Sequence, residues 1–217
     1  SLSEGHGLKD TIMSFISPDM PVQKDIEKLD TAAFIEKAEE TLAKVESKTS
    51  VIEGKLSALD AETSELKSNK SLAKRLSNFD MDLALLKDSK YTSITVGRIN
   101  AESTSEIKNE LSNLTDELEM FTVPTDDGEI ITVVTLKEFN DDVYSTLRKF
   151  DFEKIEIGNV EGTPEHVISS ADSRLLTIES ERAAVKGELR AVAEQWDDEI
   201  LALKEQLENE KDNLFFP

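Results

Sequence analysis

Residues 38–66 read AEETLAKVESKTSVIEGKLSALDAETSEL, and apolar or small residues recur in this stretch at alternating intervals of four and three. A 4-3 repeat places these residues on one narrow stripe of a helix, which is the seam of a coiled coil, whereas a helix of a globular core has a broader apolar face. The positions between them are mostly Glu, Lys, Ser, Asp and Thr, which suit a solvated surface. The seam therefore requires a partner helix. Its main apolar residues are Leu42, Val45, Ile52, Leu56, Leu59 and Leu66.

A second heptad pattern begins at Ile168 and provides that partner. The segments 41–88 and 164–212 are nearly equal in length, which predicts that the two helices pair antiparallel, with the intervening residues carried at the far tip. In this hairpin, Leu66 would lie near Lys186 and Gly187. The predicted seam residues of the second helix are Leu175, Ile178, Val185, Leu189, Val192, Trp196 and Leu203.

The region between the two helices has a mixed α/β pattern. Alternating, β-branched stretches predict strands at 91–99, 118–123, 129–136 and 153–157. Helices are expected from Ser103 and over 139–150, and an Asp-Gly turn joins the two middle strands. The order β-α-β-β-α-β is the split-βαβ or ferredoxin-like arrangement. We therefore predict an α+β fold, a long antiparallel two-helix coiled coil that carries a ferredoxin-like lobe at its tip.

The expected domain boundaries follow from these patterns. Residues 1–21 are interpreted as a tag remnant followed by an irregular or short helical segment, because Pro18 and Pro21 interrupt helices. The outgoing helix is expected over 22–89, and a break near 30–40 is compatible with the pattern. The lobe is expected over 90–161, the returning helix over 162–213 and a tail over 214–217. Thr163-Pro164-Glu165 is typical of a helix start, with a hydroxyl cap, a proline at the first position and an acid near the positive end of the dipole.

Charge and composition limit the partners. The chain has 46 acidic and 25 basic residues, a formal net charge of -21, which argues against binding nucleic acid or anionic lipid and favours a basic protein surface. The predicted strand at 129–136 also lacks the aromatic residues on which an RNA-recognition module stacks bases. There is no Cys for a disulfide or thiolate site, and no run of 18 apolar residues, so this stretch of chain is not expected to span a membrane.

Residues that carry catalytic chemistry are not recognisable. No P-loop sequence and no nucleophile motif occurs. The two histidines are His6, in the expected tag remnant, and His166, which we expect to face solvent. Asp126 and Asp127 are explained by turn geometry. We therefore expect no catalytic, cofactor-binding or metal-binding residues, and no cofactor, in a non-enzymatic scaffold.

Three groups of residues carry a resemblance to a known family. Tyr91, Thr92, Ile94, Gly97 and Ile99 open the lobe; Leu147, Phe150, Phe152, Ile155 and Ile157 close it; and Gly162-Thr163-Pro164-Glu165 starts the returning helix. In this order, over residues 30–213, the chain resembles the cytoplasmic N-terminal region of subunit I of archaeal A-type ATP synthases, the counterpart of subunit a of V-type ATPases. The family pattern marks Gly97, Phe150, Gly162 and Pro164 as structural positions.

The resemblance implies a non-catalytic stator. Such a region links the peripheral stalks, heterodimers of E and G/H type subunits, and other ATPase subunits to the membrane sector of a rotary proton-translocating enzyme, and it resists torque. It would lie at the cytoplasmic face of the cell membrane, in a parent protein that spans the membrane elsewhere. The stalk-binding residues are expected within the lobe, where the negative charge would attract a basic stalk terminus.

Two other functions remain open at this point. One is a coiled-coil adaptor or tether whose ferredoxin-like module binds a regulatory ligand or protein, which should show a pocket lined by polar residues. The other is a cytoskeletal or chaperone-like rod, which should show exposed apolar tips.

Overall fold

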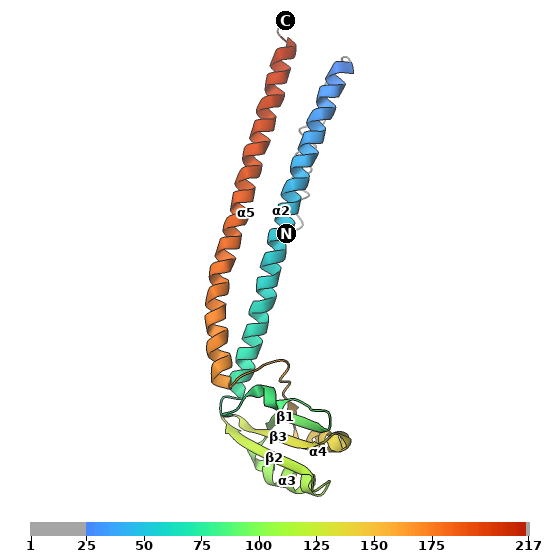
Figure 1. Ribbon diagram of the computed structural model, residues 1–217, viewed down its shortest axis with the longest axis vertical. Helices are drawn as coiled ribbons and strands as arrows, with labels where there is room; N and C mark the ends of the chain where they lie inside the picture. Colours follow the sequence, from blue (N-terminus) through green and yellow to red (C-terminus); the bar gives the residue numbers. More distant parts are fainter. Residues whose placement is uncertain (1–24, 216–217) are drawn as a thin grey trace. The chain divides into compact units, whose positions relative to one another are not determined.

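A computed structural model of the chain describes residues 25–215 (Figure 1). These residues divide into two compact units, one of residues 25–60 with 179–215 and the other of residues 61–178. The long helices α2 (Asp25–Arg75) and α5 (Pro164–Phe215) contribute to both units. Helix α2 is continuous over its whole length, so no break occurs near 30–40. The expectations for residues 1–21 lie outside the described part of the chain.

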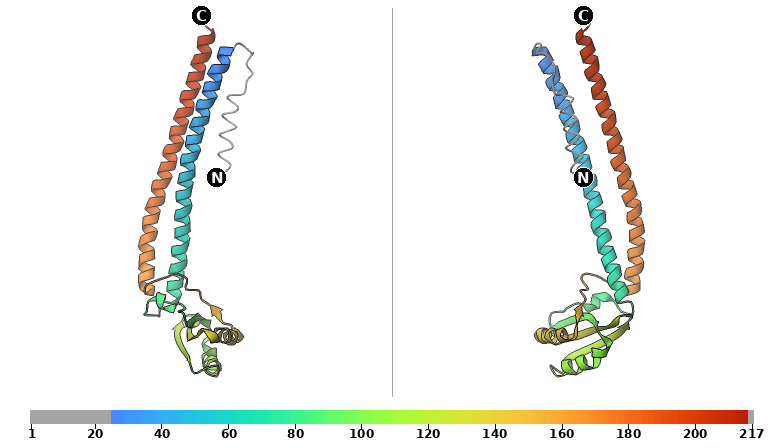
Figure 2. Two further views of the ribbon diagram at one scale, coloured as in Figure 1. Left: turned by 45° about the vertical axis from the view of Figure 1, so that its right-hand side comes forward. Right: turned by 180° about the vertical axis from the view of Figure 1, so that it is seen from behind.

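In the first unit, α2 and α5 run side by side in opposite directions (Figure 2). Lys48 Nζ donates to Gln195 Oε1 at 3.3 Å, Lys55 Nζ lies 3.2 Å from Glu188 Oε2, and Asp60 pairs with Arg182. The predicted seam residues lie between these polar contacts. Ile52, Leu59, Val185 and Trp196 are buried, while Leu42, Val45, Leu56, Leu189, Val192 and Leu203 are half-buried.

The same antiparallel pairing is found in the second unit. The Arg174 guanidinium contacts the Glu62 carboxylate through two hydrogen bonds of 2.6 and 2.9 Å, and Lys70 pairs with Asp172. Ile178 is buried, and Leu66 and Leu175 are half-buried. The pairing partners show that the predicted register, with Leu66 near Lys186, is wrong.

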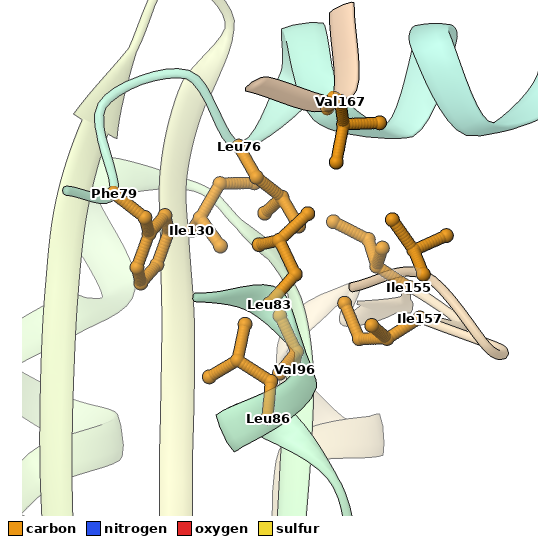
Figure 3. Close-up of a cluster of buried hydrophobic side chains, with 11 residues drawn as sticks. Leu76, Phe79, Leu83, Leu86, Val96, Ile130, Ile155, Ile157 and Val167 are labelled. Carbon is orange, nitrogen blue, oxygen red and sulfur yellow. The ribbon is translucent and has the colours of Figure 1, made fainter. Parts of the chain in front are cut away.

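The register differs because α2 ends at Arg75 and does not continue to residue 89. The apolar spacing that predicted a longer helix is real, but beyond Arg75 the chain turns and forms the short 3₁₀ helix η1 (Leu83–Leu86). Side chains from this connection pack against the sheet instead of along α5. They form one hydrophobic cluster with strand residues, shown in Figure 3, whose members include Leu76, Phe79, Leu83, Leu86, Val96, Ile130, Ile155, Ile157 and Val167.

The sheet has four strands, β1 (Thr92–Ile99), β2 (Leu118–Thr125), β3 (Gly128–Leu136) and β4 (Glu153–Lys154). Their order is β2-β3-β1-β4, and each neighbouring pair is antiparallel. Helices α3 (Thr104–Ser112) and α4 (Asn140–Leu147) follow β1 and β3. The strands and helices therefore occur in the predicted sequence, but the last strand is shorter than the predicted 153–157. After Ile155 donates its N–H to Val96 O, the chain leaves the strand, while Ile155 and Ile157 remain buried in the cluster.

The two faces of the sheet have different neighbours. Helices α3 and α4 cover one face through a second hydrophobic cluster. The opposite face contributes Val96 and Ile130 to the cluster around Leu83. The sheet is therefore packed on both faces over part of its area. The second cluster consists of Ile99, Ile107, Leu111, Ile131, Val133, Val143 and Leu147.

The connections into and out of the lobe are tied together by Asp82. One carboxylate oxygen accepts hydrogen bonds from Ala84 N and Gly162 N, both at 2.8 Å, and Leu83 N donates to Gly162 O at 2.9 Å. Gly162 has a φ of +97°, a region that favours glycine. Helix α5 then starts at Pro164, with Thr163 Oγ1 accepting from His166 N at 3.3 Å, as the sequence predicts.

Replacing Asp82 with alanine is expected to lower the melting temperature by about 2–4 °C, because it removes a helix cap and the contact between the two connections. The N–H groups of Ala84 and Gly162 hold the pKa of Asp82 below its ordinary value. A lowered pKa in the folded state contributes stability at neutral pH that is lost as the pH falls through that lowered pKa. Thermal unfolding from neutral to acid pH should therefore show a weaker acid dependence in the variant. Asp80→Ala, at an exposed neighbour, should behave as the wild type.

Candidate protein-interaction surface

Part of the sheet face opposite α3 and α4 remains uncovered. In the register of β2 and β3, Val123 lies opposite Ile130, and both contact the cluster around Leu83. Phe121, two residues before Val123 in β2, is 55% exposed. We call the surface formed by Glu119, Phe121 and the half-buried Val134 the open face, because these residues share one side of the sheet by strand alternation.

The open face adjoins a long sheet edge. Strand β2 lies at the end of the strand order and pairs, within the described sheet, with β3 alone. It has eight residues, whereas β4 at the other edge has two. An edge strand presents backbone N–H and C=O groups that an added strand can pair with. We call this outer side of residues 118–125 the β2 edge.

A buried hydroxyl lies directly opposite the exposed aromatic ring. Thr132 is paired with Phe121 in the register, and its Oγ1 is buried. Among the described residues, this atom has no hydrogen-bond partner. A buried hydroxyl without a partner lowers the stability of the free chain.

Replacing Thr132 with valine is expected to raise the free energy of unfolding by about 1 kcal/mol, because the new side chain has a similar shape and no unsatisfied hydroxyl. Urea denaturation followed by circular dichroism measures this change. Thr135→Val is the matched control on the same strand, since the Thr135 hydroxyl donates to Glu117 O at 3.4 Å. The control should be neutral or destabilising, and equal stabilisation by both substitutions would show that the hydroxyl of Thr132 is not the cause.

The surroundings of the β2 edge are acidic. Residues 109–136 contain seven Asp or Glu and no Lys or Arg. Asp127 lies 3.1 Å from Arg98 Nε, and hydrogen bonds from the Thr125 hydroxyl, together with the Arg98 charge, hold the pKa of Asp127 below its ordinary value. Glu129 accepts a hydrogen bond from the Thr104 hydroxyl at 2.6 Å. The carboxyl groups of Asp116, Glu119 and Asp126 belong to exposed residues. Carboxyl groups therefore surround the edge, with no Lys or Arg among residues 109–136 to offset them.

The positions marked by the family pattern have structural surroundings. A Cβ on Gly97 would lie 2.1 Å from the ring of Phe152 and 2.5 Å from Glu153 O. Only glycine therefore allows β1 and the segment that contains Phe152 and β4 to approach this closely. Phe150 is half-buried against the cluster under α3 and α4. Gly162 and Pro164 shape the start of α5 as described above.

The structure offers little for ligand chemistry. A cavity of about 180 Å³ is lined by Asp88, Ser93, Ile94, Thr95, Asn140, Asp141, Tyr144 and Lys154, which is small beside the volumes of about 300–1,000 Å³ typical of ligand pockets. Three of its polar side chains already have partners, since Ser93 donates to Asn140 Oδ1 at 2.8 Å and Asp88 accepts from Ile94 N at 2.8 Å. Within residues 25–215, no group of three or more His, Asp or Glu is arranged to hold a metal. His166 is exposed.

No helix in this part of the chain has the length and apolar character that crossing a membrane requires.

No protein-family model matches the chain. The A-type ATP synthase subunit I of Methanothermobacter thermautotrophicus is 43% identical over 97% of the chain. The chain belongs to the subunit I family of A-type ATP synthases. The family resemblance inferred from the sequence is thereby confirmed.

Two further comparisons describe this member of the subunit I family. The A-type ATP synthase subunit I of Methanocaldococcus jannaschii is 34% identical over 94% of the chain. The chain covers 32% and 30% of these two relatives, so it spans about a third of their length. A crystal structure of the cytoplasmic N-terminal domain of subunit I, homolog of subunit a, of V-ATPase matches with a TM-score of 0.53 and 15% identity, over 89% of this chain and 62% of that chain, which supports the fold.

The sequence predicts a partner-binding site in the lobe without naming its residues, and this stays a prediction. The open face depends on strand order, which alternation along single strands does not give. The one signal available was the acidic stretch around Phe121, which stands between Asp116 and Asp126.

Proposed function

We propose that this chain is a non-catalytic stator segment of a rotary A/V-type ATPase that links the peripheral stalks to the membrane sector and resists torque. Membership of the subunit I family supports this function. The structural observation that carries it is the antiparallel pairing of α2 and α5, helices of 51 and 52 residues that are each about 75 Å long. A pair of long helices is better suited to transmitting force than to catalysing a reaction.

The contacts between the helices explain how such a segment would resist shear. Sliding one helix along the other would separate Lys55 from Glu188 and Arg174 from Glu62, and it would remove buried seam side chains such as Ile52 from their positions. Exposed ion pairs contribute little free energy individually. Their role here is to fix the register, while the apolar seam supplies the resistance to sliding.

The lobe is the proposed docking end. Its four-stranded sheet, with the order β2-β3-β1-β4 and two helices on one face, fits a ferredoxin-like layout with a shortened last strand. The partner proposed for it is the peripheral-stalk heterodimer of E and G/H type subunits, within an enzyme whose other subunits include the membrane sector. This function places the chain at the cytoplasmic face of the cell membrane.

Calorimetric titration of the chain with the peripheral-stalk heterodimer tests this function. Saturable binding by the intact chain is expected, and binding should be lost when residues 91–160 are replaced by a short Gly-Ser loop. Circular dichroism of the replaced variant must show that the helices remain folded. Absence of binding by the intact chain would overturn the proposed function, and undiminished binding by the variant would move the contact from the lobe to the helices.

A further inference from the structure

We propose that the β2 edge and the open face form a seat for a basic, extended segment of the partner protein, which adds to the sheet beside β2. The proposal rests on the proposed function, and it names the surface and the chemistry of its occupant. Three independent features of the described residues carry it: an unpaired edge, an exposed aromatic anchor and the sign of the surrounding charge.

The edge is long enough for strand addition. The open part of the edge is residues 118–123, which pair with β3 on one side only, so their outward N–H and C=O groups lack strand partners in the described sheet. The open part ends before Pro124, which has no N–H and whose carbonyl accepts a hydrogen bond from Asn78 Nδ2 at 2.6 Å. The opposite edge is not equivalent, because β4 has two residues paired with Gly97 and Arg98. A partner strand would therefore extend the sheet at β2.

The anchor for such a strand is Phe121. Phe121 is 55% exposed on the open face, opposite Thr132 in the strand register and one pair from half-buried Val134 on the same side of the sheet. An added strand places alternate side chains on this face, next to Phe121 and Glu119. An apolar residue beside Phe121 would cover the ring, and a Lys or Arg beside Glu119 would pair with its carboxylate.

Charge decides between the possible occupants. A second copy of this chain would bring its own six acidic residues within 116–119 and 126–129 against the same edge, and each chain carries a net charge of -21. Like charges opposed across a strand pair are destabilising, and acidic residues on an edge strand are a common protection against self-association. The same charges attract a basic segment and speed its association. The occupant that fits is therefore a strand in which Lys or Arg alternates with apolar residues.

The test measures binding of the peripheral-stalk heterodimer to the chain and to two single variants, Phe121→Ala and Glu119→Lys. Each variant is expected to raise the Kd at least tenfold, and Glu119→Lys should also reduce the salt dependence of binding. Leu201→Ala is the matched control, because Leu201 is an equally exposed apolar residue (56%) on α5, outside the proposed seat. The control should bind as the wild type. Unchanged binding by both lobe variants, with intact wild-type binding, would overturn this proposal and leave the proposed function standing.

A second measurement is independent of the stalk. A synthetic peptide of alternating Lys and Val is titrated into the isotopically labelled chain, and amide chemical shifts are followed by NMR. Shifts concentrated in residues 118–125 and 128–136 are expected, and a peptide of alternating Glu and Val should cause none. Absence of shifts with the basic peptide, or equal shifts with both peptides, would overturn the proposal whatever the stalk titration gives.

Discussion

Replacing Gly97 with alanine is expected to lower the free energy of unfolding by about 2–3 kcal/mol, although the change adds a single methyl group. The new Cβ would lie 2.1 Å from Phe152 Cε2 and 2.5 Å from Glu153 O. The ring can move, but the second contact is backbone, so relief requires separating β4 from β1. That movement disturbs the pairing of Gly97 with Lys154. Urea denaturation of the variant and the wild type measures the loss.

Gly54→Ala is the control with the same chemical change. Gly54 lies within α2, and a Cβ there would meet no atom within 4 Å. This variant is expected to be more stable than the wild type by about 1 kcal/mol, since alanine favours a helix over glycine. Opposite signs at the two positions are the predicted result. Destabilisation of similar size at both would show that close packing at Gly97 is not the cause.

Replacing Leu83 with alanine is expected to cost about 2–5 kcal/mol, the largest effect predicted for a single residue of this chain. Leu83 is fully buried in the cluster shown in Figure 3, where side chains from the connection, the strands and the start of α5 meet. Truncation removes apolar contacts and leaves a cavity. The surrounding connection, strands and start of α5 pack on one another in the same cluster, so they cannot move freely to fill it. Thermal and urea unfolding should both report the loss.

Leu85→Ala separates burial from residue type. Leu85 lies in the same 3₁₀ helix two positions later, but it is 67% exposed. The expected change is within about 0.5 kcal/mol. A comparable loss at both positions would mean that the 3₁₀ helix itself, and not the packing of Leu83 beneath the sheet, determines the effect.

The helix pair could be predicted from the sequence because its signal is local and periodic. Apolar residues recur at heptad spacing along each helix. Ile52 belongs to one of these patterns and Val185 to the other, and both are buried in the structure. The end of α2 could not be predicted in the same way. Leu76, Phe79 and Leu83 continue the spacing of three and four, yet they pack under the sheet after the helix has ended at Arg75. The spacing of apolar residues shows which residues are buried but not what they pack against. Apolar residues of a connection that packs on a sheet can have the same spacing as those of a helix.

The interaction surface was less predictable because it depends on contacts between distant residues. The alternation in 118–123 predicted a strand correctly, but it did not show that this strand lies at the edge of the sheet. The exposure of Phe121 and the isolation of the Thr132 hydroxyl follow from that position. Likewise, Asp82 gave no sign in the sequence that its carboxylate would join residues 84 and 162.

The charge of the lobe links these observations to assembly. A long, partly apolar strand edge would promote self-association in a neutral protein. Here the acidic residues around β2 oppose pairing of identical chains and leave the edge free for a basic partner. The proposed stator function would require this selectivity, because the edge would have to remain unpaired until the proposed partner is present.

Cross-linking mass spectrometry of the assembled parent ATP synthase tests the central claim most directly. With a lysine-reactive cross-linker, Lys108, Lys137, Lys149 and Lys154 of the lobe should form cross-links to the peripheral-stalk subunits. Lysines within the paired helices, such as Lys48 and Lys55, should cross-link mainly within this chain. Cross-links from the lobe to the catalytic or membrane subunits alone, with none to the stalks, would contradict the assignment of the lobe as the docking end of a stator.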